Sequence, residues 1–265
     1  MAATTDTMTL DPAPLPAQET PADAGIRWWV EGLITLVFYV IYSTIRNQFG
    51  SALGGDIIDR SFDNAMRVID FEAAIGLYHE EWIQARFIDF DPFIVFWNVF
   101  YGTFHFVVTG FALIWTYRSM PERWRLVRNS FLVMTALALV GFALYPLLPP
   151  RLLPESYGYL DTMVEIGGLW SFDSGAMQKV SNQYAAMPSL HFGWALWCFM
   201  VLYPVLQKRW QRVLIALYPL ATLFSIVVTA NHYVLDAVGG AVVAGLGYVI
   251  GRRLTRLRAP RFRVE

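Results

Sequence analysis

The stretch Val213–Leu235 reads VLIALYPLATLFSIVVTANHYVL and contains no Asp, Glu, Lys or Arg. A helix that crosses the hydrocarbon core of a bilayer needs about 20 mostly apolar residues, so this stretch is long enough to enter a membrane. The polar break Ala230-Asn231-His232 separates it from a second apolar run that follows Asp236. We therefore predict two membrane helices here, over residues 212–230 and 232–251.

The rest of the chain gathers its apolar residues in the same way. Of its 265 residues, 56% are hydrophobic and 15% are charged, whereas a soluble domain averages about a quarter charged residues. The composition excludes a disordered chain, a coiled coil and a disulfide scaffold, and it disfavours an ordinary soluble enzyme. We predict an all-α integral membrane protein, a six-transmembrane-helix bundle, whose first four spans lie at residues 28–46, 93–116, 129–149 and 189–206.

Between the first two predicted spans lies a segment that is too polar to cross a bilayer. Its residues Phe62, Met66, Ile69 and Ala73 recur at helical spacing and share one face. This pattern is typical of an amphipathic interfacial helix at the membrane surface, and it fits a helix packed on the bundle equally well. The predicted loop at 150–188 is long, and loops of that length are commonly lids or binding loops.

The basic residues divide unequally between the two sides of such a bundle. Six spans place both termini on one side, where 14 of the 20 Lys and Arg residues then lie. Because basic loops stay in the cytoplasm, we expect cytoplasmic termini in a protein of the cell membrane. The chain then consists of a disordered cytosolic tail (1–26), a six-span membrane domain (27–251) and a basic cytosolic tail (252–265). We interpret the basic tail as an anchor on anionic lipid and expect no nucleic acid as a partner.

Titratable groups at membrane depth are costly and commonly mark functional sites. His232 and Asp236 are four residues apart at the outer start of the sixth predicted helix, which places them on one helix face. A carboxylate there can fix the tautomer of the imidazole while the other ring nitrogen attacks an electrophile. A structural polar contact between helices explains the pair equally well when it is taken alone.

A second group of residues lies at the outer start of the fourth predicted helix. Pro188 is a helix-start signal, and the free N–H groups of the first turn, with the Ser189 hydroxyl, make an anion site. A phosphate held there lies beside His191, which can protonate a leaving oxygen. Arg151, at the outer end of the third helix, adds a cation suited to phosphate or a snorkelling anchor. The topology predicts that these groups and the His232–Asp236 pair meet at one membrane depth on the extracytoplasmic side.

The run Pro188-Ser189-Leu190-His191, with His232 and Asp236 about forty residues later, resembles the type-2 phosphatidic acid phosphatase superfamily. Members are six-helix membrane enzymes that cleave or transfer phosphoesters without a metal, so the resemblance implies no cofactor. It implies that His232 is a nucleophile that forms a phosphohistidine and that Asp236 orients it. His191 would be the general acid and then the base, while Ser189, Arg151 and helix N–H groups would bind the phosphate.

The chain departs from the common superfamily pattern at its cations. Ser225 stands where the family has its Ser, but Ile226 follows in place of the family Arg, and only Pro149-Pro150-Arg151 stands near the first motif. The chain more closely resembles the inositol phosphorylceramide synthases, the target class of aureobasidin, over residues of about 55–251. The residues that carry this resemblance are Ser189 to His191, Asn231-His232-Tyr233 with Asp236, and Tyr101 with His105 in the second helix. Further site candidates are therefore His105, Tyr101, Asn231 and Ser225, and possible substitute cations are Arg46, Arg67 and Lys179.

The resemblance implies that the 27–251 domain is catalytic and acts on a membrane lipid phosphoester. We expect a lipid phosphotransferase of inositolphosphotransferase type, with a lipid or sugar alcohol as acceptor. With water as acceptor, the same chemistry gives a lipid phosphate phosphatase. Two other classes stay open: a zinc site built from His191, His232 and Asp236, and a non-enzymatic lipid transporter or scaffold. The glycines of the sixth helix, Gly247 and Gly251 among them, are at packing spacing and fit an enzyme or a transporter.

Overall fold

The computed structural model describes residues 25–51, 55–168 and 184–257, and the regular structure of these residues is helical. Almost all of the predicted N-terminal tail lies outside the described residues. The predicted basic tail begins inside the last helix, which continues to Leu257, and residues 258–265 lie outside the description.

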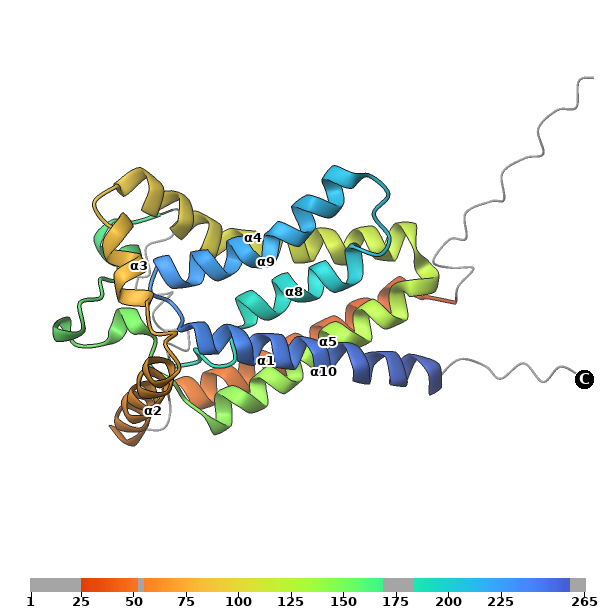
Figure 1. The fold of residues 1–265 in the computed structure, drawn as a ribbon. Helices are drawn as coiled ribbons and strands as arrows, with labels where there is room; N and C mark the ends of the chain where they lie inside the picture. The colour runs from red at the N-terminus through yellow and green to blue at the C-terminus, as the bar shows by residue number, and fades with distance from the viewer. Residues whose placement is uncertain (1–24, 52–54, 169–183, 258–265) are drawn as a thin grey trace, which may run out of the picture.

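The helices follow one another along the chain and gather into a bundle (Figure 1). The main helices are α1 (Trp28–Ser51), α2 (Gly55–Ala74), α4 (Asp91–Ser119), α5 (Pro121–Leu144), α8 (Leu190–Leu202), α9 (Arg209–Val228) and α10 (Val234–Leu257). The short elements are α3 (Glu80–Phe87), α6 (Thr162–Glu165) and two 3-10 turns, Pro150–Leu152 and Glu155–Tyr157.

Four of these helices are long and apolar enough to cross a membrane: α4, α5, α9 and α10. Their most apolar 18-residue windows have mean hydropathies between 1.4 and 1.8. Two shorter apolar helical segments, Trp28–Ile41 and Leu190–Leu202, fall where the sequence predicts the first and fourth spans. The described chain is thus an all-helical membrane protein with four candidate spans, and a count of six spans stays a prediction.

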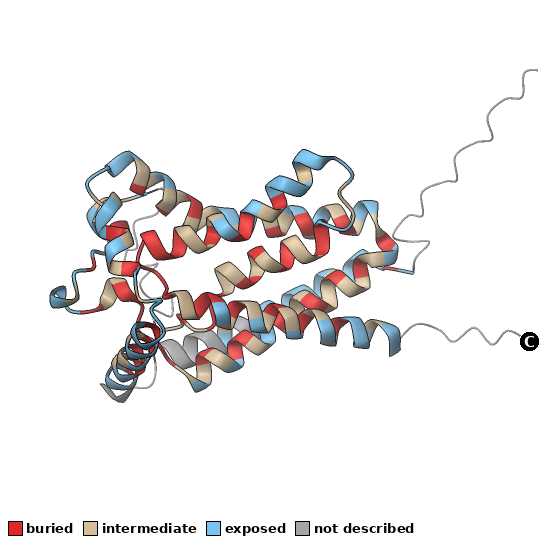
Figure 2. Ribbon diagram, viewed as in Figure 1, coloured by how far each residue is buried: buried red, intermediate tan, exposed pale blue. Residues whose placement is uncertain are grey.

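The core of the bundle lies where α8 and α10 pack against α5. Figure 2 shows buried residues on the facing sides of the helices. Gly247 and Gly251 of α10 lie so close to α5 that a Cβ at position 247 would fall 2.6 Å from the Met134 Cβ. Deeper in the same interface, the buried Trp197 indole of α8 donates to the Ser130 hydroxyl of α5 at 2.9 Å. Glycine spacing on α10 therefore serves helix packing, as the sequence predicted.

The two ends of the bundle differ. At one end the start of α1 is joined to the start of α5 by the Glu31–Arg128 ion pair, and Asn129 donates to Thr255 of α10 at 3.2 Å. The opposite end, here called the loop end, is formed by α2, α3 and residues 145–168 (Figure 1). There the Ser189 N–H donates to the Asp236 carbonyl at 2.9 Å. The starts of α8 and α10 therefore meet at the loop end.

Helix α2 packs against the other segments of the loop end through a face that differs from the predicted apolar stripe. Its described buried residues are Ile57, Ser61, Asn64, Ala65, Val68 and Glu72, whereas Phe62, Met66 and Ile69 are half-buried and Ala73 is exposed. Hydrogen bonds select this face, because the Asn64 amide donates to the Pro146 carbonyl at 2.8 Å. The interpretation of α2 as a surface-lying interfacial helix stays a prediction.

Candidate active site

His232 and Asp236 form a buried pair where α9 passes into α10. The His232 Nδ1 lies 3.1 Å from the Asp236 Oδ2, and the same oxygen accepts the Tyr233 N–H at 3.1 Å. The Asp236 side chain is completely buried. A carboxylate at Nδ1 favours the tautomer that carries its proton there, so the Nε2 lone pair points away from Asp236 and can attack an electrophile.

The turn that presents His232 is fixed by its backbone. The N–H groups of Asn231 and His232 both donate to the Ile226 carbonyl, at 3.0 and 3.1 Å, and the Arg151 N–H donates to the Ala230 carbonyl at 2.8 Å. Ile226, which stands where the family has Arg, is completely buried. Its contribution here is thus a carbonyl that shapes the turn.

His191 lies in the first turn of α8 and faces three other rings. It stacks on Tyr101 with ring centroids 4.1 Å apart and an interplanar angle of 22°. The His105 ring lies 4.3 Å away from it, edge to face, and the His232 ring lies 5.7 Å away. We call the four side chains Tyr101, His105, His191 and His232 the ring cluster. The structure therefore brings residues of α4, α8 and the α9–α10 turn together.

Ser189 joins the start of α8 to the His232–Asp236 pair. It is the N-cap of α8, and its hydroxyl accepts the Phe192 N–H at 3.4 Å. Its own N–H binds the Asp236 carbonyl, and its carbonyl packs where a side chain at Gly240 would have to lie. The positive end of the α8 dipole is therefore held next to the ring cluster, where an anionic group is stabilised.

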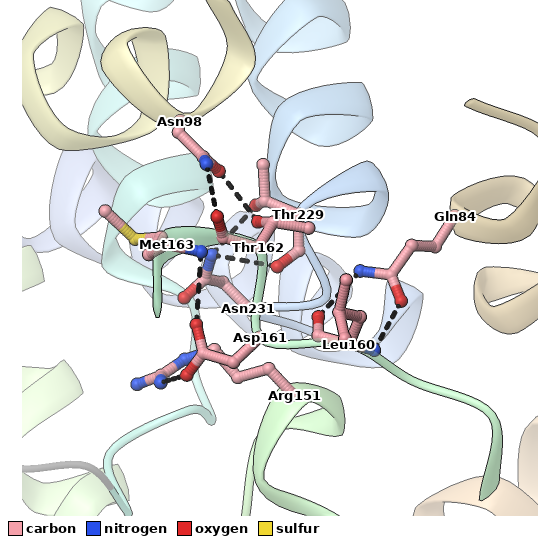
Figure 3. Close-up of polar contacts among 9 residues, drawn as sticks. All are labelled: Gln84, Asn98, Arg151, Leu160, Asp161, Thr162, Met163, Thr229 and Asn231. Atoms are coloured by element: carbon pink, nitrogen blue, oxygen red, sulfur yellow. Dashed lines mark hydrogen bonds and ion pairs between the residues drawn. The ribbon is translucent and has the colours of Figure 1, made fainter. Parts of the chain in front are cut away.

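Arg151 is already engaged with a carboxylate. Its guanidinium forms an ion pair with Asp161, which also caps α6 by accepting the Met163 N–H at 3.2 Å (Figure 3). Figure 3 shows this pair near Asn231 and Thr162. A phosphate that uses Arg151 must therefore share it with Asp161 or displace that carboxylate.

The segment 160–167, which carries Asp161, is tied to two helices. The Asn98 amide of α4 donates to the carbonyls of Thr162 and Gly167, at 2.9 and 2.7 Å, and accepts the Thr162 hydroxyl at 2.8 Å. Gln84 of α3 pairs with both backbone groups of Leu160, at 2.9 and 3.0 Å (Figure 3). Part of the long predicted loop is thus a built structure next to the candidate site.

Two further candidates have contacts of another kind. The Ser225 hydroxyl donates to the Trp97 carbonyl at 3.2 Å, and the Asn231 amide donates to the carbonyl and hydroxyl of Thr229. These contacts join α9 to α4 and brace the α9–α10 turn. Of the possible substitute cations, Arg67 lies 3.5 Å from the Asn64 side chain, whereas Lys179 and the side chain of Arg46 lie outside the described residues.

The described residues include no group of three or more His, Cys, Asp and Glu side chains arranged to hold a metal ion. They do include two completely buried acids that the sequence reasoning missed, Glu72 and Glu80. The sequence pattern could have indicated the burial of Glu72, because Glu72 falls on the same helix face as the apolar Ala65 and Val68. Glu80 follows His79, which is exposed.

One comparison with known proteins gives a match. A family model described as the PAP2 superfamily matches residues 66–250. No curated protein and no solved structure matches the chain. The matched residues run from α2 to α10 and include the ring cluster, Arg151, Ser189 and Asp236.

Proposed function

The chain belongs to the PAP2 superfamily, and from that premise we propose that it transfers or cleaves the phosphoester head group of a membrane lipid through a phosphohistidine. Membership itself suggests a lipid enzyme of the phosphoesterase type. The observation that carries the proposal further is the His232–Asp236 hydrogen bond, with the His191 ring 5.7 Å from the His232 ring. A nucleophile, its orienting carboxylate and a second imidazole stand together in a buried site.

The proposed reaction has two steps. In the first, the Nε2 of His232 attacks phosphorus, the phosphorus–nitrogen bond forms, and the bond to the leaving alcohol breaks while His191 supplies its proton. In the second, His191 takes a proton from the acceptor hydroxyl, whose oxygen attacks phosphorus and releases His232. Asp236 stabilises the cationic ring of His232 between the steps.

The phosphate oxygens need positive partners throughout. The start of α8 with its Ser189 cap offers N–H groups and a helix dipole, and Arg151 offers a guanidinium that suits phosphate geometry. Both lie beside elements that hold His232, because Ser189 binds Asp236 and Arg151 binds Ala230 through their backbone N–H groups.

We assign the lipid phosphotransferase of inositolphosphotransferase type as the first candidate and the phosphatase as the second. Ile226 in place of the family Arg, and the packing of Tyr101 and His105 on His191, favour the transferase. We further propose six spans with cytoplasmic termini and a site on the extracytoplasmic side, which the distribution of Lys and Arg supports.

Product analysis with the purified protein tests the function. The substrates are a panel of radiolabelled phospholipids and polyprenyl phosphates, each with and without inositol or a lipid alcohol as acceptor. Wild type should release or transfer the head group, should do so in the presence of a chelator, and should form an acid-labile, alkali-stable phosphoenzyme. His232→Ala should lose activity and phosphoenzyme, by a factor of about 10⁴ or more if the covalent route is the only one.

His79→Ala is the matched control, since His79 is an exposed histidine of the loop end. It should behave as wild type. Equal activities of wild type and His232→Ala would contradict the proposal, and loss of wild-type activity on chelation would favour a metal site instead. Formation of product only when an alcohol is present identifies a transferase. Release of free phosphate from a monoester, or of the phosphorylated head group from a diester, when no alcohol is present identifies water as the acceptor.

A further inference from the structure

The N–H group of Tyr233, which precedes α10, and those of the first two residues of α10 donate to carboxylates. The Tyr233 N–H donates to Asp236 at 3.1 Å, the Val234 N–H to Glu80 at 2.9 Å, and the Leu235 N–H to Glu72 at 2.5 Å. Such N–H groups have no partner within their own helix, and the helix dipole favours anions there. Two acids from α2 and α3 therefore complete the start of the helix that carries Asp236.

These two acids do what an N-cap side chain does elsewhere. Tyr233 is the residue before α10, and its hydroxyl donates to the distant Leu148 carbonyl, so its side chain does not cap the helix. Asp236, three residues later, accepts the Tyr233 N–H as the third helical residue of a capping box does. Without Glu72 and Glu80, the N–H groups of residues 234 and 235 would also compete for Asp236 and draw it from His232.

The surroundings of the two acids favour a protonated Glu72. Both are completely buried, and the second oxygen of Glu80 accepts the His79 N–H at 2.9 Å. The second oxygen of Glu72 is buried without a hydrogen-bond donor, and the Glu80 carboxylate is close enough to raise the pKa of Glu72. Two neighbouring buried carboxylates resist joint ionisation. Burial and the Glu80 carboxylate raise the pKa of Glu72 to about 9, so a proton on Glu72 can donate to Glu80 at neutral pH.

We propose that Glu72 and Glu80, as a pair, are positioning residues that hold the first turn of α10 and thereby keep Asp236 on His232. The proposal rests on the proposed function, because it assigns a task within that reaction. The N–H groups that Glu80 and Glu72 accept belong to residues 234 and 235, which lie between His232 and Asp236 in the chain. A shift of either group moves both members of the catalytic pair.

The expected pH dependence follows from the raised pKa of Glu72. The pKa of Glu72 in the folded protein lies above its ordinary value of 4.5. The stabilisation that protonated Glu72 gives to the folded protein is therefore complete below pH 4.5 and is lost as the pH rises through about 9. Ionised Glu72 then repels Glu80 and Asp236. The titratable groups that face Glu72 are Glu80 from α3, Asp236 and Tyr233 from α10, Tyr78 before α3 and Tyr159 from the loop end. Burial raises the pKa values of Tyr78 and Tyr159 above 10, so these two do not supply a transition near pH 9.

The test compares Glu72→Gln with Glu72→Ala, and Asp70→Asn, an exposed acid of the same helix, is the control. Gln keeps an acceptor for the Leu235 N–H and has its own donor for Glu80. We expect Glu72→Ala to lower kcat about tenfold, as loss of a buried cap predicts, with KM within about twofold. Glu72→Gln should retain kcat within about threefold and should lose the alkaline decline that we expect of wild type near pH 9.

The pH profile separates positioning from simple loss of folded protein, because fewer folded molecules scale a profile without moving its midpoint. If Glu72→Gln keeps the wild-type alkaline midpoint, or Glu72→Ala keeps the wild-type kcat, the proposal is overturned. Hydrogen exchange of the amides of residues 233–235 gives a readout without activity. Faster exchange in Glu72→Ala, together with wild-type exchange rates in Glu72→Gln, would support the role of Glu72 in holding the first turn of α10, whether or not any lipid is turned over. If these exchange rates are found but the wild-type protein has no activity, the proposed function alone is rejected. Unchanged exchange in Glu72→Ala would reject the clamp.

Discussion

At the scale of single residues, Arg151 shows how the site balances its charges. Its ion pair with Asp161 places a carboxylate where the proposed reaction needs a phosphate. A carboxylate and a phosphate bind the same guanidinium through charge-assisted hydrogen bonds. The two anions therefore compete, and Asp161 lowers the affinity of the site for substrate while it keeps Arg151 in place.

This competition predicts the effect of Asp161→Asn. The amide oxygen still caps α6 at Met163, but Arg151 loses an anionic partner, so phosphate binding should become about threefold to tenfold tighter. The inhibition constant of orthovanadate or inorganic phosphate measures it. The matched control is Glu155→Gln, which changes an exposed acid of the same loop and should leave the constant unchanged. Weaker inhibition in Asp161→Asn would show that Asp161 positions Arg151 and does not compete with the anion.

At the scale of helices, substitution of Gly by Ala at two positions of α10 should change the stability of the protein in opposite directions. A Cβ at Gly247 would meet Met134 of α5, whereas at Gly245 nothing lies within 4 Å. Gly247→Ala should therefore destabilise the protein by about 1–3 kcal/mol through overpacking. Gly245→Ala should stabilise it by up to about 1 kcal/mol through helix propensity. Thermal unfolding in one detergent compares the two, and equal shifts would show that α5 and α10 pack less closely.

The helices also show what sequence patterns can predict. Each of the six apolar runs coincides with a helix of the described chain (α1, α4, α5, α8, α9 and α10), but the helix ends shift. The third span was predicted from residue 129, whereas α5 begins at Pro121, because its first turns carry Arg123, Arg125 and Arg128 and a search for charge-free runs excludes them. A prediction from helix propensity would include these turns, because Arg is a good helix former.

The site was predictable to the extent that its residues lie in motifs. Spacing on one helix face predicts the His232–Asp236 contact, and topology predicts that His191 lies near it. Glu72 and Glu80 reach α10 across 163 and 154 residues of chain, and no local pattern encodes contacts of that range. The partner of Arg151 was missed for a related reason, since it lies within a loop that has no hydrophobic period.

At the scale of the whole molecule, the two ends of the bundle predict an orientation. The start of α1 and the end of α10 lie at one end of the bundle (Figure 1), and the starts of α8 and α10, next to His191 and His232, meet at the loop end. With the basic loops in the cytoplasm, a reporter fused after residue 265 should behave as cytoplasmic. A reporter inserted in the 152–186 loop should behave as extracytoplasmic, and a cytoplasmic result there would overturn the orientation.

The clamp on α10 also has a consequence for biosynthesis. The ribosome makes α2 and α3 before α10, so Glu72 and Glu80 lack their N–H partners until the last helix has been synthesised. On the proposed mechanism, a nascent chain that stops before residue 232 has Tyr101, His105 and His191 but lacks the nucleophile. The proposed activity would then arise only in the last stage of membrane insertion, and incomplete chains could not attack the lipids around them.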